Sequence, residues 1–242
     1  MTTTHRIGSP TAMALGAAAG YLVGSLSFSR FVGSRAAPGE DLNVTHIEVQ
    51  EVGATVEFHG VTPTSVKEHA GAGAAMLTVA LEAAKAALPT LAARVLLPNT
   101  PAAPAAAAGA VVGHVLPLWN GLRLGGYGMS PMLGGMLVLD PVGLVVTTAS
   151  ISGLIEALHD RRIMMAWPVA VPAWEAVRGR RDLVVYGLVA NGVYWARLVP
   201  ELRRGLGALL STRRPVPAGS VREDVAAAEG DHPREGENGP AH

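Results

Sequence analysis

Long uncharged stretches alternate with short polar segments along this chain. No Asp, Glu, Lys or Arg occurs between Arg6 and Arg30 or between Arg94 and Arg123, and Asp140 is the only charge in residues 124–155. A helix needs about 20 apolar residues to cross a bilayer, so the first two stretches are long enough. Soluble cores seldom contain uncharged runs of this length, and the pattern therefore predicts membrane-spanning helices.

The apolar segments predict an all-α polytopic membrane protein with about seven short or full-length transmembrane helices. The expected segments are residues 11–33, 71–96, 105–118, 131–139, 141–158, 163–176 and 183–198. The segment 163–176 is too short to cross upright, and Pro168 and Pro172 interrupt it. From residue 211 onward Pro, Gly, Glu and Arg dominate, which predicts a disordered tail (211–242) after a membrane domain of residues 1–210.

The longest polar loop, residues 34–70, contains a partial alternation of apolar and polar positions from Asn43 to His59. Two β-branched stretches flank Gly53-Ala54, which is typical of a β-hairpin. We therefore expect a small cytoplasmic hairpin inserted between the first two long helices.

Basic residues gather in three of the predicted loops. They are Arg30, Arg35, Lys67, Arg123, Arg161 and Arg162. Because cytoplasmic loops carry an excess of Lys and Arg, these loops predict an outside N-terminus and a cytoplasmic C-terminus. The arginines at 178–181 fit this scheme only if residues 163–176 are re-entrant.

Composition agrees with a membrane protein: 49% of the 242 residues are hydrophobic, 16% are charged, and the mean hydropathy is +0.31. A soluble domain usually carries about a quarter charged residues. An Ala-rich soluble helical domain is the alternative, although membrane helices also use small residues where they pack closely. The 19 basic and 19 acidic residues indicate no nucleic-acid partner, and the absence of cysteine excludes disulfides and thiol chemistry.

A glycine-rich loop follows the third expected helix. Gly125, Gly126 and Gly128 permit close approach of a ligand and aim backbone N–H groups at one point, and Arg123 adds a cation. Such an arrangement is suited to phosphate, although glycines beside membrane helices are more often turn or packing residues.

Several motifs together resemble a known family. Gly113-His114-Val115-Leu116-Pro117, followed by Gly125-Gly126-Tyr127-Gly128, resembles G-H-x-x-P and F-K-G-G-K-G of the bacterial membrane family that transfers an acyl group from acyl phosphate to glycerol 3-phosphate. Residues 20–29 (GYLVGSLSFS) look like its first motif, G-Y-L-x-G-S-I-P-F-S, and residues 82–85 (EAAK) resemble its D-x-x-K-G segment. The resemblance covers about residues 11–205.

This chain departs from the family pattern at polar positions. Both lysines of F-K-G-G-K-G are replaced, by Leu124 and Tyr127, and Ser27 stands in place of the first motif's proline. The motif G-S-G-N-x-G-x-T-N has two rival partial matches, residues 53–55 and 60–65. The family's C-terminal His-Arg-x-Asn corresponds here to residues 194–197, YWAR.

The resemblance implies roles for particular residues, with no metal and no cofactor. Ser25 and His114 would orient the nucleophile. The substrate-binding and phosphate-binding residues would be Ser29, Lys67, Lys85, Arg123, Gly125, Gly126 and Gly128. Alternatively, the serines bond back to helix carbonyls, and Glu82 and Lys85 form a structural ion pair on one helix face.

Two functions follow from these interpretations. The first is an acyltransferase of phospholipid synthesis in the bacterial plasma membrane, whose partners are the lipid bilayer, acyl phosphate and glycerol 3-phosphate. The second is a non-catalytic or repurposed homologue that acts as a membrane binding or interaction protein, with the hairpin as a docking element. A transporter is less favoured because its broken helices would recur as an internal repeat.

Overall fold

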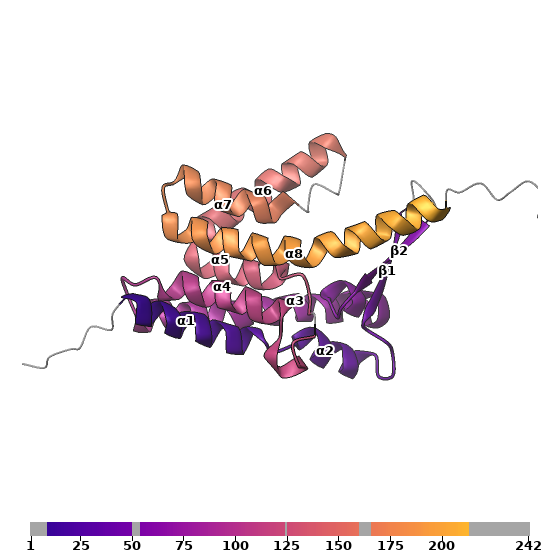
Figure 1. Cartoon of the computed structure of the whole chain (residues 1–242), viewed down its shortest axis with the longest axis horizontal. Helices are drawn as coiled ribbons and strands as arrows, with labels where there is room; N and C mark the ends of the chain where they lie inside the picture. Colours follow the sequence, from indigo (N-terminus) through magenta and orange to yellow (C-terminus); the bar gives the residue numbers. More distant parts are fainter. Residues whose placement is uncertain (1–8, 50–53, 124, 160–165, 213–242) are drawn as a thin grey trace, which may run out of the picture.

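The computed structural model describes residues 9–49, 54–123, 125–159 and 166–212, and within these ranges the side chains except those of residues 47–49, 54–56 and 205–212 (Figure 1). In chain order the elements are α1 (Ser9–Gly24), α2 (Phe28–Ala36), β1 (Val44–Val49), β2 (Ala54–His59), α3 (Pro63–Leu96), α4 (Ala102–Val115), the 3-10 helix η1 (Leu118–Asn120), α5 (Met129–Leu139), α6 (Pro141–Leu158), α7 (Trp167–Val177) and α8 (Arg181–Thr212). The predicted tail lies outside the described residues.

Five helical stretches are long and apolar enough to cross a membrane. They are Ser9–Ala36, Pro63–Leu96, Ala102–Asn120, Pro141–Leu158 and Arg181–Arg204. Large apolar side chains are well exposed on them, among them Met76 (74%) and Leu96 (75%) on α3, as expected where lipid is the solvent. The prediction of a helical membrane protein with a small hairpin is confirmed, and α5 and α6 begin and end within two residues of their predicted limits.

α4 lies at the centre of the bundle and packs against α1 through small residues. Gly16, Gly20 and Gly24 of α1 lie on the backbone of α4, where an added Cβ would overlap the carbonyl oxygens of Ala102, Ala106 and Ala110. Membrane helices use glycine in this way because apolar side chains gain little by leaving lipid, so that close backbone contact drives association. The arrangement fixes the end of α1 against the end of α4, next to His114.

The first expected span is present, but the helix is interrupted within it. α1 ends at Gly24, and α2 begins at Phe28 with Ser27 as its N-cap, whose hydroxyl accepts a hydrogen bond from Arg30 N at 3.4 Å. Serine is a preferred N-cap because its oxygen satisfies an unpaired N–H of the first turn. The break turns the chain so that Ser29 enters the bundle.

The hairpin prediction is confirmed. β1 and β2 pair antiparallel from Val44↔His59 to Val49↔Ala54. The hairpin stands at one end of the bundle, beside the beginning of α3 and the end of α8 (Figure 1). We call this end of the molecule the hairpin end. The connections that contain Asn99 and Asp140 lie at the opposite end.

The opposite end holds the arginines that did not fit the predicted orientation. Arg178 Nη1 donates to Asp140 Oδ2 at 2.7 Å, and Arg180 Nη1 lies 3.4 Å from the same oxygen. Asp140 therefore pairs with both arginines and offsets one of their two positive charges. α7 has 11 residues, too few to cross a bilayer, and α8 is longer than predicted at both ends.

Candidate functional site

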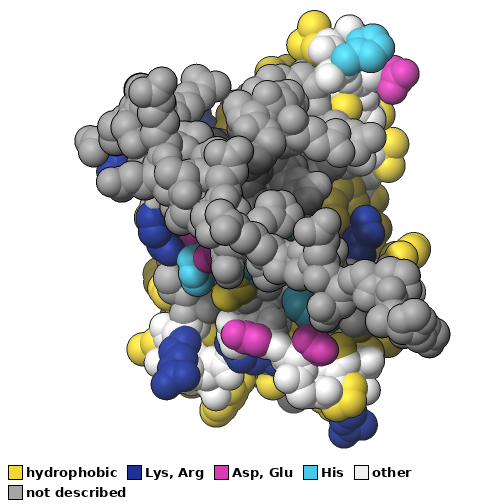
Figure 2. All heavy atoms as spheres, turned by 90° about the vertical axis from the view of Figure 1, so that its right-hand side faces the viewer, with side chains coloured by type: hydrophobic (Ala, Val, Ile, Leu, Met, Phe, Trp, Pro, Cys, Tyr) yellow, Lys and Arg dark blue, Asp and Glu magenta, His cyan; other side chains and the backbone are white. Residues whose placement is uncertain are grey.

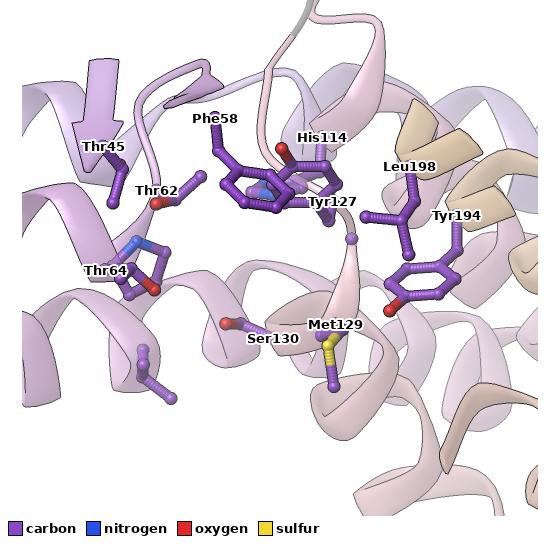
Figure 3. A pocket seen from close by; sticks show the side chains of 13 residues that line it. Thr45, Phe58, Thr62, Thr64, His114, Tyr127, Met129, Ser130, Tyr194 and Leu198 are labelled. Carbon is purple, nitrogen blue, oxygen red and sulfur yellow. The ribbon is translucent and has the colours of Figure 1, made fainter. Parts of the chain in front are cut away.

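A cavity of about 410 Å³ opens at the hairpin end, where several elements meet (Figure 3). The hairpin, the start of α3, α4, the glycine-rich loop and α8 all contribute to its wall. Its lining residues are Thr45, Phe58, Thr62, Pro63, Thr64, Val79, His114, Tyr127, Gly128, Met129, Ser130, Tyr194 and Leu198. The wall is mainly apolar, with hydroxyl groups and one imidazole as its polar functions.

Two helix N-termini reach this cavity. α3 begins with a capping box, in which Thr62 Oγ1 accepts from Ser65 N at 3.2 Å and Ser65 Oγ accepts from Thr62 N at 3.0 Å. α5 begins at Met129, after Gly128 in the left-handed conformation (φ 89°) and without a side-chain cap. The first N–H groups of a helix have no partner within it and carry its positive dipole end, so both termini favour an anion.

A buried charged network lies behind the cavity. Glu82 of α3 is fully buried and accepts hydrogen bonds from Ser29 N at 2.9 Å and from Ser29 Oγ at 3.0 Å. Its second oxygen forms an ion pair with Lys85 and lies 3.1 Å from His114 Nδ1. Glu82 therefore joins α2, α3 and α4 at one point, and each of these groups is satisfied by another.

Lys85 is the internal counter-ion of this network. Only 2% of it is exposed, and besides its ion pair with Glu82 it donates to Leu26 O at 2.5 Å and lies 3.0 Å from His114 Nδ1. It does not line the cavity. An unpaired charge inside a membrane helix bundle is costly, which explains the pairing. The structure thus shows the ion pair with Glu82 that was the alternative interpretation of Lys85, and its binding to phosphate stays a prediction.

His114 connects the network to the cavity. Its Nδ1 faces Glu82 and Lys85, while its Nε2 lies against Gly126, where an added Cβ would overlap the ring. When Nδ1 donates to Glu82, Nε2 is the nitrogen that remains as a proton acceptor. This arrangement of carboxylate, imidazole and cavity is suited to general base chemistry.

The glycine-rich loop is packed tightly onto the end of α4. Gly125 N donates to Val115 O at 2.9 Å, and a Cβ at Gly125 would overlap the carbonyl oxygen of His114. The N–H of Gly125 is thus already used within the protein. Gly128 lines the cavity, whereas Gly125 and Gly126 hold the loop against His114.

The other predicted site residues lie in different places. Ser25 is buried and donates back to Tyr21 O at 2.8 Å, and it does not line the cavity. Arg123 is exposed on the loop. Lys67 is exposed and lines an open groove of about 610 Å³, which shares Pro63, Thr64 and Val79 with the cavity. Figure 2 looks onto this end and shows charged side chains of both signs here, with hydrophobic side chains around them.

Residues 60–65 are the rival motif match that reaches the cavity, through Thr62 and Thr64. Of the match at residues 53–55, Gly53 lies outside the described residues, and the other two residues begin β2.

Sequence reasoning missed a second polar cluster beside the cavity. Arg197 of α8 is 3% exposed, donates to Glu201 Oε1 at 2.6 Å and to the carbonyl of His59, and lies over the ring of Tyr127 at 4.8 Å. It ties the hairpin, α8 and the glycine-rich loop together. The four-residue spacing of Arg197 and Glu201 was a visible signal, because such residues share one face of a helix.

Comparison with known proteins gave consistent matches over most of the chain. The family model described as glycerol-3-phosphate acyltransferase matches residues 14–204. A glycerol-3-phosphate acyltransferase from Maricaulis maris is 33% identical over 224 residues, which cover 90% of this chain and 93% of that protein. One from Anaeromyxobacter sp. is 38% identical over 128 residues, covering 51% of this chain and 57% of that protein.

A solved structure has a similar fold. It is a crystal structure of PlsY, an integral membrane glycerol 3-phosphate acyltransferase, in its glycerol 3-phosphate form. The TM-score is 0.64 at 19% sequence identity, and the superposition covers 87% of this chain and 98% of that one. The fold of this chain is therefore that of an integral membrane protein.

Proposed function

Because the chain belongs to the glycerol-3-phosphate acyltransferase family, we propose that it transfers an acyl group from acyl phosphate to glycerol 3-phosphate in phospholipid synthesis. The observation that carries this proposal is the cavity at the hairpin end, where His114 faces a space bounded by two helix N-termini. An imidazole and anion-binding backbone groups are what an anionic acceptor and an anionic leaving group require.

The phosphate groups are proposed to lie near the starts of α3 and α5. Thr64 and Ser130 offer hydroxyl donors there, together with their own backbone N–H groups; in α3 the N–H of Ser65 is already bonded to Thr62, and Pro63 has none. Lys67 supplies a positive charge at the mouth of the adjoining groove, and the exposed Arg123 supplies another at the hairpin end. Lys85, Ser29 and Ser25 serve behind this surface by holding the network and the helix ends that position His114.

The proposed reaction is a direct attack. A hydroxyl oxygen of glycerol 3-phosphate forms a bond to the acyl carbon, the bond between that carbon and the bridging phosphate oxygen breaks, and inorganic phosphate leaves. The hydroxyl proton passes to His114 Nε2 in the tautomer whose Nδ1–H donates to Glu82. Acyl phosphate is already activated, so the enzyme supplies position and electrostatic stabilisation without a covalent intermediate.

The acyl chain is proposed to follow the groove along α3. Ala72, Ala75, Met76 and Ala80 line it, beyond the residues it shares with the cavity. Small side chains on the membrane-facing part of α3 leave room for a hydrocarbon chain. The groove adjoins the cavity, since Pro63, Thr64 and Val79 line both, and the imidazole of His114 lines the cavity.

We also propose a location in the bacterial plasma membrane with the N-terminus outside and the C-terminus in the cytoplasm. Arg30, Arg35, Lys67 and Arg123 belong to the hairpin end, which would be cytoplasmic. Of the arginines at the opposite end, Arg178 and Arg180 are paired with Asp140. This asymmetry supports the orientation because unpaired Lys and Arg favour the cytoplasmic side.

The purified protein in detergent, given acyl phosphate and labelled glycerol 3-phosphate, is expected to form lysophosphatidate. The control is the double variant His114→Ala, Arg123→Ala, which should lose nearly all of this activity. Product no greater than that of the control would reject the enzyme and favour the non-catalytic membrane binding protein.

A further inference from the structure

A buried pair of acidic residues lies at the end of the molecule opposite the cavity. Glu175 of α7 is fully buried, and Asp140, at the corner between α5 and α6, is 5% exposed. Their carboxyl groups are within hydrogen-bonding reach of each other. Two carboxylates that share a buried site repel each other, so one of the two groups holds a proton. The proposed acyl transfer uses neither group.

The donors around the pair decide which carboxyl group holds this proton. Oδ2 of Asp140 accepts from Trp174 Nε1 at 3.3 Å and from Arg178 Nη1 at 2.7 Å. Among the described residues, no donor lies within hydrogen-bond distance of either oxygen of Glu175. Asp140 is therefore stabilised as the carboxylate. Glu175 is the acid, and its O–H satisfies the buried group by donating to Asp140.

Arg180 is the further cation that faces the pair. Its Nη1 lies 3.4 Å from Asp140 Oδ2, and its Nε lies 3.7 Å from Glu175 Oε2. The other charged or ionisable side chains described on the helices that pack on α7 are exposed or belong to the hairpin end: Glu156, His159, Arg181, Asp182, Arg197, Glu201, Arg203 and Arg204. The balance between Asp140 and Arg180 therefore governs the ionisation of Glu175.

The pair lies where α7 meets the corner between α5 and α6. α7 packs on α6 and α8 (Figure 1). Arg180, which follows α7, also donates to Leu139 O at the end of α5, at 3.2 Å. Gly143 at the start of α6 lies so close to Asp140 and Trp174 that an added Cβ would overlap both side chains. The hydrogen bond from Glu175 therefore joins α7 to a closely packed corner.

We propose that one proton, shared by Asp140 and Glu175, holds α7 against the corner between α5 and α6. When Glu175 releases the proton to solvent, two buried carboxylates face each other, and the contact between α7 and the corner opens locally. The contact closes again when the proton returns. This pH-dependent element lies at the end of the molecule away from the cavity, and it does not depend on acyl transfer.

The pH at which the contact opens follows from the surroundings of Glu175. Burial and the hydrogen bond with Asp140 raise the pKa of Glu175 to about 7, against the opposing effect of Arg180. In the open form the side chain reaches solvent and returns toward its ordinary pKa of 4.5. The closed form therefore binds the proton more tightly, and it loses its advantage as the pH rises through about 7.

Infrared difference spectroscopy of the purified protein tests the shared proton. The wild-type protein should show the carbonyl stretch of a buried protonated carboxyl group at about pH 6, and this signal should disappear at about pH 8.5. Glu175→Gln should lack the signal. The matched control is Glu156→Gln, which changes an exposed carboxyl group of α6 and should keep it. In Asp140→Asn the signal should be confined to lower pH, because no second carboxylate then opposes the ionisation of Glu175.

Deuterium exchange of the α7 amides in detergent tests the opening. After correction for the intrinsic exchange rate, protection in the wild-type protein and in Glu156→Gln should fall about tenfold between about pH 6 and about pH 8.5. Glu175→Gln should stay protected at both values, because its amide donates to Asp140 whatever the pH. The proposal is overturned if the wild-type protein lacks the infrared signal, if the signal persists in Glu175→Gln, or if the protection of α7 depends on pH equally in both proteins.

Discussion

The carboxylate of Glu82 accepts from every other member of the buried network, so its removal is the most informative perturbation. In Glu82→Leu, Lys85 keeps its charge in a site that is 2% exposed and loses its counter-ion. Ser29 loses the acceptor of both its backbone and its hydroxyl hydrogen bonds. Removing one partner of a buried ion pair costs about 3–5 kcal/mol, because the remaining charge stays buried and uncompensated.

Thermal unfolding in detergent, followed by tryptophan fluorescence, measures this cost. For a chain of this size about 1 kcal/mol corresponds to about 2–4 °C, so Glu82→Leu should lower the midpoint by about 6–20 °C. The control is Glu82→Leu with Lys85→Met, which removes both charges and replaces them with apolar side chains. It should recover most of the loss, since apolar replacement of a whole buried pair is often nearly neutral. If the double variant is no more stable than the single one, the ion-pair reasoning is refuted.

Three further predictions concern packing, orientation and pH. Gly20→Leu should destabilise the protein by about 1–3 kcal/mol or more, because its Cβ overlaps a carbonyl oxygen of α4. The control is Gly153→Ala, which has open space around the added Cβ and should unfold at an unchanged temperature. The chain has no cysteine, so an impermeant maleimide should label Asn99→Cys in intact cells and Glu40→Cys only after permeabilisation; the reverse pattern would invert the proposed orientation. Burial and a neighbouring aspartate raise the pKa of Glu175 to about 7. In the folded protein Glu175 therefore keeps a proton that it loses near pH 4.5 in the unfolded chain. Stability should therefore fall as the pH rises from about 4.5 through 7, and Glu175→Gln should flatten this dependence; an equal slope in both proteins would contradict it.

The parts of the fold that were predictable are those set by local sequence. Uncharged length located the spans, and Asp140-Pro141 separated α5 from α6, because Pro is suited to the first turn of a helix. Strand alternation located the hairpin. The break at residues 25–27 was missed because hydropathy does not register a serine N-cap, and α8 continues past residue 198 because Arg197 and Glu201 bury their charges against each other.

The site was predictable only in its motif residues. The spacing of Glu82 and Lys85 placed them on one helix face, and the G-H-x-x-P motif marked His114, but no local pattern shows that all three meet and neutralise one another. That arrangement depends on the packing of α3 against α4. It makes Lys85 the counter-ion of Glu82. Thr45 is in the cavity wall for a similar reason, since the hairpin's position on the bundle is a tertiary property.

The cavity beside His114 is proposed to direct a hydroxyl onto the carbon of an acyl phosphate. Acyl phosphate labelled with heavy oxygen at the bridging position, incubated with the purified protein and glycerol 3-phosphate, tests it most directly by mass spectrometry. Attack at carbon predicts that the label leaves entirely in inorganic phosphate as lysophosphatidate accumulates. Label recovered in free fatty acid, with glycerol 3-phosphate unacylated, would show that the acyl carbon is not attacked by the acceptor.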